Sequence, residues 1–376
     1  MSTFHTSRRI VLRLTLAGMT KGRAMRIAFT LAIGVLAGLL TIWFQRDHVS
    51  DLAQPWGAAR TWRAGLNPYD AVGPEPWRAF HSSYRLIYPF TAVLLTVPLS
   101  ALPLWLAEGV LVGLGTITLA WALTRTPRDA RLWVFASAAF LAVPQMVQWS
   151  PLLTASALMP SLGFVMLAKP QIGLPLLLAY PSRRAVIGCA ALALLSFAIW
   201  PGWIWPWLDA LRTDAGHITA PMRLPGGFLL ALAALKWRRP EARLLLAMSV
   251  IPHNHSRYEI VPLFLIVHTW REGVALTLCT IVEYAIVLGL FLSGTSLERV
   301  EALSGTLILW CVYLPCLALI LRRPNAEPAR ITITGWVTGR HEGTFESPLV
   351  IDPGDRVAFS LDPPSARVNG ELHQAD

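Results

Sequence analysis

The stretch MRIAFTLAIGVLAGLLTIWF, from Met25 to Phe44, decides the fold class. A run of about 20 apolar residues is the length that crosses a ~30 Å hydrocarbon core as a helix. The segment at 1–24 before it holds basic side chains and no acid, and no small-residue cleavage site follows it. We therefore predict an uncleaved anchor with a cytoplasmic N-terminus, which places the loop at 45–85 outside the cytoplasm.

The composition of the whole chain agrees with a membrane protein. Of its 376 residues, 54% are hydrophobic and 14% are charged, whereas soluble globular proteins have about 25% charged residues. This argues against an ordinary soluble enzyme. Further apolar runs lie near 86–104, 105–123, 132–147, 152–168, 171–180, 185–207, 226–237, 243–251, 259–270, 272–293 and 303–321. We predict an all-α polytopic membrane protein with roughly 9–12 transmembrane helices, some of them broken or re-entrant.

Proline interrupts many of these runs, for example at Pro144, Pro151, Pro170, Pro175 and Pro262. A proline within a span frees a backbone carbonyl, which protein or cavity water must then satisfy. The broken runs therefore favour an internal cavity that water can enter. The alternative is that proline is simply commoner in transmembrane helices than in soluble ones.

Charge divides the chain into two parts. Residues 1–323 hold 28 Lys and Arg against 14 Asp and Glu, and residues 324–376 hold 4 against 8. The basic residues lie between apolar runs, which is typical of loops that set membrane orientation and argues against nucleic acid as a partner. The acidic tail at 324–376 contains the alternating stretch Ile331–Val337 and a turn at Asp352–Asp355 between Leu349–Ile351 and Arg356–Leu361. It is predicted to be a small β-like appendage of two to four strands.

Two further patterns concern aromatic residues and cysteines. The tryptophans of the first loop, Trp56, Trp62 and Trp77, predict short helices at the membrane interface. The Trp-rich segment 197–208 is interpreted as an aromatic belt that anchors the protein, with a substrate platform as the alternative. All four cysteines lie in apolar runs without zinc-site spacing, so we predict neither a metal site nor a resident cofactor.

The acids that follow the first apolar run are the first candidates for chemistry. Asp47 and Asp51 are four residues apart and would share one face of a continued helix. A carboxylate at the membrane boundary can meet a lipid-borne substrate. Glycosyl transfer needs such a group, because the acceptor hydroxyl is a poor nucleophile until a base takes its proton. The alternative is that both are solvated interface acids.

Several segments, in this order, resemble blocks of glycosyltransferase family 87, a branch of the GT-C membrane glycosyltransferases. They are DLAQPWGAARTWRAGLNPYD at 51–70, YPFTAVLLTVPLSALP at 88–103, QWSPLL at 148–153, AKPQIGLP at 168–175, Pro252-His253, and Tyr258-Glu259. The resemblance covers about residues 25–322. The chain departs from the family pattern at Phe90, Val147 and Glu259, where the family has Pro, Gly and Asp. These departures leave the sugar and the acceptor open.

The resemblance implies a GT-C-like fold over 25–323 and an integral plasma-membrane enzyme. Its donor would be a polyprenyl-phosphate sugar, with mannose as the sugar, and its acceptor an extracytoplasmic glycolipid or glycan. Asp51 would be the general base of a single inverting displacement at an extracytoplasmic active site. This mechanism needs one base and no covalent intermediate.

The remaining candidates each have two interpretations. Lys169 can hold the donor phosphate or snorkel at a helix end, and Gln148 can bind a sugar or satisfy backbone near the prolines. His253 can bind phosphate or assist acceptor deprotonation. Candidate substrate-binding residues at the cavity mouth and in the late block are Arg60, Tyr88 and Tyr258. Glu259 can pair with neighbouring charges, and no role follows from the sequence for Glu108 or Glu283.

Two other functions compete with glycosyl transfer. Broken helices and charges within apolar runs also fit a transporter or a flippase for a lipid-linked sugar, although no internal repeat is evident and the first loop is unusually long. A degenerate family member that acts only as an assembly partner is the third hypothesis.

Overall fold

The computed structural model describes residues 21–46, 50–82, 84–126, 128–214, 219–253 and 256–325, and four short segments of the tail at 330–333, 343–346, 367–368 and 371–372. Most of the predicted basic segment 1–24 lies outside the described residues, as does Asp47. Two compact units are distinguished, 1–328 and 329–376.

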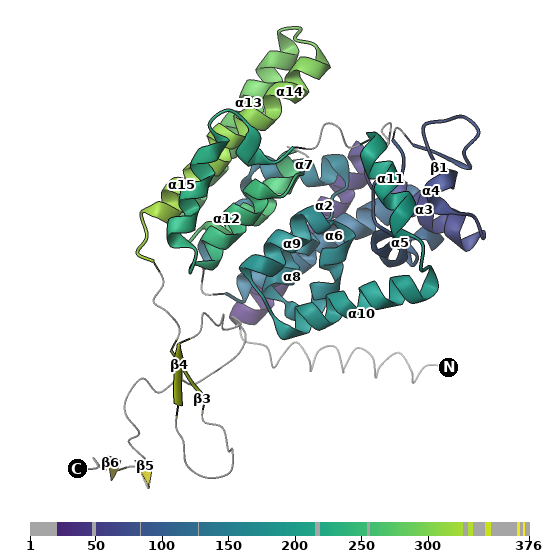
Figure 1. Cartoon of the computed structure of the whole chain (residues 1–376). Helices are drawn as coiled ribbons and strands as arrows, with labels where there is room; N and C mark the ends of the chain where they lie inside the picture. Colours follow the sequence, from purple (N-terminus) through teal and green to yellow (C-terminus); the bar gives the residue numbers. More distant parts are fainter. Residues whose placement is uncertain are drawn as a thin grey trace, which may run out of the picture. The chain divides into compact units, whose positions relative to one another are not determined.

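The described part of the first unit is built almost entirely of helices (Figure 1). The α-helices are α2 (Lys21–Phe44), α3 (Ala53–Arg63), α4 (Pro68–Ala71), α5 (Phe90–Thr96), α6 (Leu104–Thr124), α7 (Ala138–Met146), α8 (Ser150–Leu158), α9 (Pro170–Ala179), α10 (Arg183–Ile199), α11 (Ile204–Asp214), α12 (Pro240–Val250), α13 (Trp270–Leu292), α14 (Leu297–Ile308) and α15 (Leu314–Leu321). The 3₁₀ segments are η1 (Leu99–Ala101), η2 (Asp129–Ala136), η3 (Pro160–Ala168), η4 (Pro221–Arg223), η5 (Gly227–Lys236) and η6 (Arg257–Ile266). A π-helical turn, η7 (Leu309–Tyr313), joins α14 to α15. In the first loop the two-residue strands β1 (Val72–Gly73) and β2 (Phe80–His81) pair in parallel.

Among the described residues, four helices are long and apolar enough to cross a membrane: Gly22–Phe44, Leu104–Thr124, Trp270–Leu292 and Leu297–Leu321. A fifth span results if α10 and α11, which are bent by 101° at their junction, count as one. The coarse prediction of a mostly helical protein with several membrane helices is confirmed. The predicted number of roughly 9–12 spans is not reached by this criterion of length and hydropathy, because the other apolar runs form shorter segments.

Proline explains why those segments are short. Pro144 lies in α7, which ends two residues later, and Pro170 and Pro175 lie in α9. Pro262 lies in η6. Since proline lacks the backbone donor and clashes with the preceding turn, it ends or distorts a helix. The middle of the chain is thus a set of short helices and 3₁₀ segments packed between the long ones.

The outer faces of the long helices are apolar. Leu39 and Trp43 of α2 are 60% and 58% exposed, and Phe291 and Leu292 of α13 are 57% and 74% exposed. Hydrocarbon solvates such surfaces at no cost, whereas water does not. The exposed faces therefore agree with a lipid bilayer as the surroundings of this unit.

Glycines allow α2 and α6 to pack closely. A Cβ atom added at Gly38 would lie 2.9 Å from the carbonyl oxygen of Gly109, and one added at Gly113 would lie 3.2 Å from that of Gly34. In each helix the two glycines are four residues apart and share one face, which is the small-residue pattern that brings membrane helices together. The pairing of Gly34 with Gly113 and of Gly38 with Gly109 shows that the two helices are antiparallel.

This antiparallel pairing defines two ends of the unit. The Lys21 end of α2 lies beside the Thr124 end of α6, and the Phe44 end of α2 lies beside Leu104. We call the first the basic end, because the arginines that follow α6 gather there. Arg128 pairs with Glu241 at the start of α12 (3.4 Å), and the same Glu241 oxygen lies 2.5 Å from Nε2 of His268.

Other basic turns reach the same end. Arg131 donates to the carbonyl oxygen of Leu265 at 2.7 Å. Arg323, after α15, donates to the carbonyl oxygen of Ile266 at 2.8 Å and pairs with Glu272 of α13 at 2.7 Å. The turns that carry Arg131 and Arg323 thus lie near each other, because they bond adjacent carbonyl oxygens.

The described residues of the tail form four short strands. β3 (Arg330–Ile333) pairs antiparallel with β4 (Gly343–Glu346), and β5 (Arg367–Val368) pairs antiparallel with β6 (Glu371–Leu372). The first pair includes part of the alternating stretch Ile331–Val337. The predicted strands Leu349–Ile351 and Arg356–Leu361, and the turn between them, lie outside the described residues.

The close approach of α2 and α6 generates a prediction. Gly38→Leu should lower the unfolding free energy by about 1–3 kcal/mol, the usual cost of overpacking, because the new side chain would meet backbone of α6. The matched control is Gly289→Leu in α13, where an added Cβ meets nothing within 4 Å. Chemical unfolding in detergent micelles measures both. Equal stability of the two variants would contradict this account of the packing.

Candidate functional site

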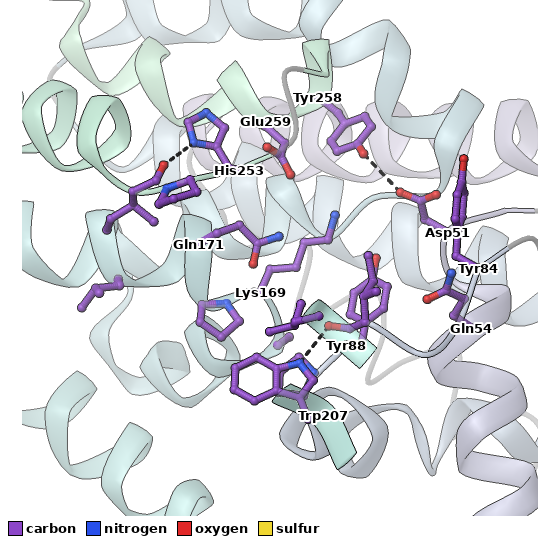
Figure 2. A pocket seen from close by; sticks show the side chains of 18 residues that line it. Asp51, Gln54, Tyr84, Tyr88, Lys169, Gln171, Trp207, His253, Tyr258 and Glu259 are labelled. Carbon is purple, nitrogen blue, oxygen red and sulfur yellow. Dashed lines mark hydrogen bonds between the residues drawn. The ribbon is translucent and has the colours of Figure 1, made fainter. Parts of the chain in front are cut away.

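A cavity of ≈ 510 Å³ opens at the end of the unit opposite the basic end (Figure 2). Segments far apart in the sequence form its walls: the start of the first loop, residues 84–89, the beginning of α9, the middle of α11, and residues 251–259. Its lining comprises Asp51, Gln54, Tyr84, Ile87, Tyr88, Pro89, Ala168, Lys169, Pro170, Gln171, Leu174, Trp207, Leu211, Ile251, Pro252, His253, Tyr258 and Glu259. Five predicted site residues are in this set: Asp51, Tyr88, Lys169, His253 and Tyr258.

Asp51 is held in the cavity wall by side chains from two other segments. Its Oδ2 atom accepts a hydrogen bond from Nε2 of Gln148 and another from the hydroxyl of Tyr258, at 3.2 Å. The backbone N–H of Asp51 donates to the carbonyl oxygen of Met146 at 3.3 Å. The carboxylate is therefore fixed in direction, while the residue keeps partial exposure.

The residue before Asp51 ties the loop to α6. The hydroxyl of Ser50 donates to Oε1 of Glu108 at 2.5 Å, and accepts from the backbone N–H of Ala53 at 3.2 Å. Glu108 is buried, at 2% exposure. No role for this acid follows from the sequence; in the structure it positions the turn that carries Asp51.

Gln148 links Asp51 to Lys169. Its Nε2 donates to Asp51, and its Oε1 accepts from Nζ of Lys169 at 2.6 Å. These two bonds define the orientation of the amide, because only its nitrogen can donate and only its oxygen can accept. Gln148 is buried and is not part of the cavity lining, so in this structure it is a bridge between two lining residues.

The backbone that presents Gln148 is strained. Val147 ends α7 with φ +55° in the left-handed region. A β-branched residue rarely adopts this conformation, and such outliers gather at functional sites. Val147 is fully buried, so the surrounding packing holds it there. A glycine would adopt the same backbone conformation without strain.

Lys169 lies at the start of α9 and is 5% exposed. Its Nζ atom lies 4.9 Å from the ring centre of Tyr258 and 5.5 Å from that of Tyr88, within the range of cation–π contacts. Among the described residues, no carboxylate forms a salt bridge with it. The side chain therefore does not snorkel to the surface; it presents a cation to the cavity.

His253 has partners on both ring nitrogens. Nδ1 lies 2.8 Å from the carbonyl oxygen of Ile251, which can only accept, so Nδ1 carries a proton. Nε2 lies 2.9 Å from the hydroxyl of Tyr313, which belongs to the π-helical turn η7. Such turns frequently occur at functional sites. The ring is thus fixed in the wall, as a cavity residue; its predicted catalytic role stays a prediction.

Glu259, for which the sequence suggested only pairing with neighbouring charges, is also a site residue. It lines the cavity, is 1% exposed, and its Oε2 atom has no hydrogen-bond partner among the described residues. Burial raises the pKa of Glu259 to about 8; Lys169 opposes this shift and Asp51 adds to it. At neutral pH the group is therefore a carboxylic acid. Its neighbour Arg257 pairs instead with Glu283 of α13, at 2.7 Å.

The tryptophans of the Trp-rich segment lie in two different surroundings. Trp205 is 72% exposed, as an interface anchor would be. Trp207, two residues later and about 200° around the helix, lines the cavity and donates to the carbonyl oxygen of Ile87 at 2.9 Å. The position of each tryptophan around the helix is the sequence signal that could have distinguished the exposed Trp205 from the lining Trp207. Gln54, Tyr84 and Gln171 also line the cavity, and nothing in the sequence distinguished them.

Two predicted site residues, Gln148 and Arg60, are not in the cavity lining; Gln148 bonds two lining residues, whereas Arg60 lies away from the cavity. Arg60 is exposed on α3, and its guanidinium lies 4.8 Å from the ring centre of Trp56. Gln54, six residues earlier, faces the cavity, so Arg60 is turned about 240° away on the same helix. Arg60 is better described as a surface residue of the first loop.

Two searches complete the description of the site. Among the described residues, no group of three or more His, Cys, Asp or Glu side chains is arranged to hold a metal ion. Comparison of the chain with protein-family models, curated proteins and solved structures finds no match.

The carboxyl of Glu259 generates a prediction about stability and pH. Its pKa is raised in the folded protein from 4.5 to about 8, so the folded chain retains a proton that the unfolded chain releases. Stability should therefore fall as pH rises through this window. The advantage of Glu259→Gln over the native chain in thermal midpoint should grow from pH 4.5 to pH 8. Glu298→Gln, an exposed acid of α14, is the control. If the difference in thermal midpoint between Glu259→Gln and the native chain did not change with pH, the raised pKa of Glu259 would be contradicted.

Proposed function

We propose that this protein is a membrane glycosyltransferase that moves a sugar from a polyprenyl-phosphate carrier to a hydroxyl of an extracytoplasmic glycolipid or glycan. The observation that carries the proposal is the meeting of Asp51 and Lys169 in one cavity, bridged by Gln148. Transfer from a phosphate carrier requires both a proton acceptor and a cationic partner for the phosphate. Mannose is the sugar that the sequence resemblance implies.

The proposed reaction is a single displacement. The acceptor hydroxyl oxygen attacks the anomeric carbon from the face opposite the phosphate, and its proton passes to the carboxylate of Asp51. The bond between the anomeric carbon and the phosphate oxygen breaks, and the polyprenyl phosphate leaves with the electron pair. The configuration at the anomeric carbon is inverted.

The described contacts suit these roles. Gln148 and Tyr258 donate to the same oxygen of Asp51, which leaves Oδ1 for the acceptor proton. Lys169 is bound by an amide oxygen and two aromatic rings rather than by a carboxylate. Its charge is therefore available to an anion, and a buried ammonium group stabilises charge that develops on a leaving phosphate.

The distribution of charge supports an orientation. Membrane proteins carry an excess of Lys and Arg in their cytoplasmic loops. The basic end holds Arg128, Arg131, Arg243 and Arg323, and Asp51 lies at the other end of α2. We therefore propose a plasma-membrane protein whose basic end is cytoplasmic and whose cavity is extracytoplasmic.

The base generates the most direct functional prediction. Asp51→Asn should lower kcat for sugar transfer by about 10²–10⁴-fold, the usual contribution of a general base, because the amide cannot take the proton. Transfer from a radiolabelled polyprenyl-phosphate mannose is measured in proteoliposomes. Asp129→Asn, an exposed acid of η2, is the control.

Two outcomes would contradict the proposal. Unchanged transfer by a normally inserted Asp51→Asn protein would remove the role of the base. Movement of the lipid-linked sugar across the bilayer by the native chain, without a glycosidic product, would favour the flippase hypothesis.

The orientation has its own test. In a variant free of native cysteines, Leu66→Cys in the first loop should react with a membrane-impermeant maleimide on intact cells. Trp270→Cys, at the basic end, should react only after permeabilisation. Both native side chains are exposed, at 46% and 62%. The reverse labelling pattern would place the cavity on the cytoplasmic side.

A further inference from the structure

Glu259 lines the cavity with a buried carboxyl oxygen that has no hydrogen-bond partner among the described residues. Buried polar atoms are almost always hydrogen-bonded, so an unpaired one in a ligand-sized cavity calls for an explanation. Glu259 is 1% exposed, and Oε2 has no partner among the described residues. Figure 2 shows its carboxyl group on one side of the Lys169 side chain and Asp51 on the other.

Neither of the two cations near Glu259 is bonded to this oxygen. Arg257, the adjacent cation, pairs with Glu283, and Lys169 donates to Gln148. Gln171 hydrogen-bonds the Glu259 side chain and does not account for Oε2. The groups that act electrostatically with Glu259 are Lys169, Asp51, Tyr88, Tyr258 and Tyr313.

We infer that the free carboxyl oxygen of Glu259 binds a hydroxyl group of the transferred sugar, which makes Glu259 a specificity-determining residue of the proposed reaction. The inference rests on the proposed function, because that function puts a sugar in this cavity. A phosphate is a poor match for an acid, and Lys169 offers it a cation. A sugar hydroxyl can both donate and accept, so it fits a carboxylic acid that can do the same.

A series of deoxy sugars tests this inference. The probes are short-chain polyprenyl-phosphate mannose and its 2-, 3-, 4- and 6-deoxy analogues, with binding followed by quenching of tryptophan fluorescence, since Trp207 lines the cavity. A site built to bond a hydroxyl rejects the analogue that lacks it. The native protein should bind one analogue at least ~10-fold more weakly than the parent.

Variants of Glu259 assign that discrimination to its side chain. In Glu259→Leu the parent sugar and the sensitive analogue should bind equally, because the bonding oxygen is gone. Glu259→Gln keeps one oxygen and one donor, so it should retain part of the discrimination, and it serves if the Leu variant does not fold. Glu298→Leu on the exposed face of α14 should behave as the native protein.

The pH dependence of KM for the donor tests whether Glu259 contacts the bound sugar or only supports the fold. Above pH about 8 the native acid ionises beside Lys169, so KM for the donor should rise. The KM of Glu259→Gln should not follow this rise.

The outcomes distinguish a failure of the proposed function from a failure of the inference about Glu259. If no probe binds the native chain, the proposed function fails. If the native chain binds and transfers the parent sugar but Glu259→Leu keeps the full discrimination, or the native chain shows none, only the inference about Glu259 is overturned.

Discussion

A lysine ammonium withdrawn from water needs partners that replace its lost hydration, and the site depends on how Lys169 meets this requirement. An amide oxygen of Gln148 and the rings of Tyr88 and Tyr258 surround it, and no carboxylate among the described residues forms a salt bridge with it. The same amide donates to Asp51. A cation and a carboxylate are thus held in fixed relation without neutralising each other. That arrangement is suited to a ligand that brings an anion and a proton donor together.

The site and the arginine-rich turns that follow α6 and α15 lie at opposite ends of the first unit. Close packing of α2 on α6 through glycines sets the two helices antiparallel, so the turn that carries Asp51 lies away from the arginine-rich turns. At the far end Arg131 and Arg323 donate to backbone carbonyls around the end of η6. At the near end the same η6 begins with the residues that contact Asp51 and line the cavity. One short segment therefore connects the charged end to the proposed reaction centre.

The sequence predicted the helical membrane character and five of the residues that line the cavity, because apolar runs and isolated polar residues within them are local features. It did not predict the bridge made by Gln148, which depends on the strained backbone of Val147. It also could not show that Arg257 would pair with Glu283, 26 residues away in the chain, and so leave Glu259 to the cavity. By length and hydropathy the described residues hold four or five candidate spans, because several of the other apolar runs form shorter helices and 3₁₀ segments.

The most direct test of the central claim is a structure of the protein in lipid nanodiscs with a phosphonate analogue of a polyprenyl-phosphate sugar. The account predicts that the phosphonate displaces Gln148 as the partner of the Lys169 ammonium and that the anomeric carbon of the sugar faces the Asp51 carboxylate. An analogue bound elsewhere, with the bond between Lys169 and Gln148 intact, would contradict the account.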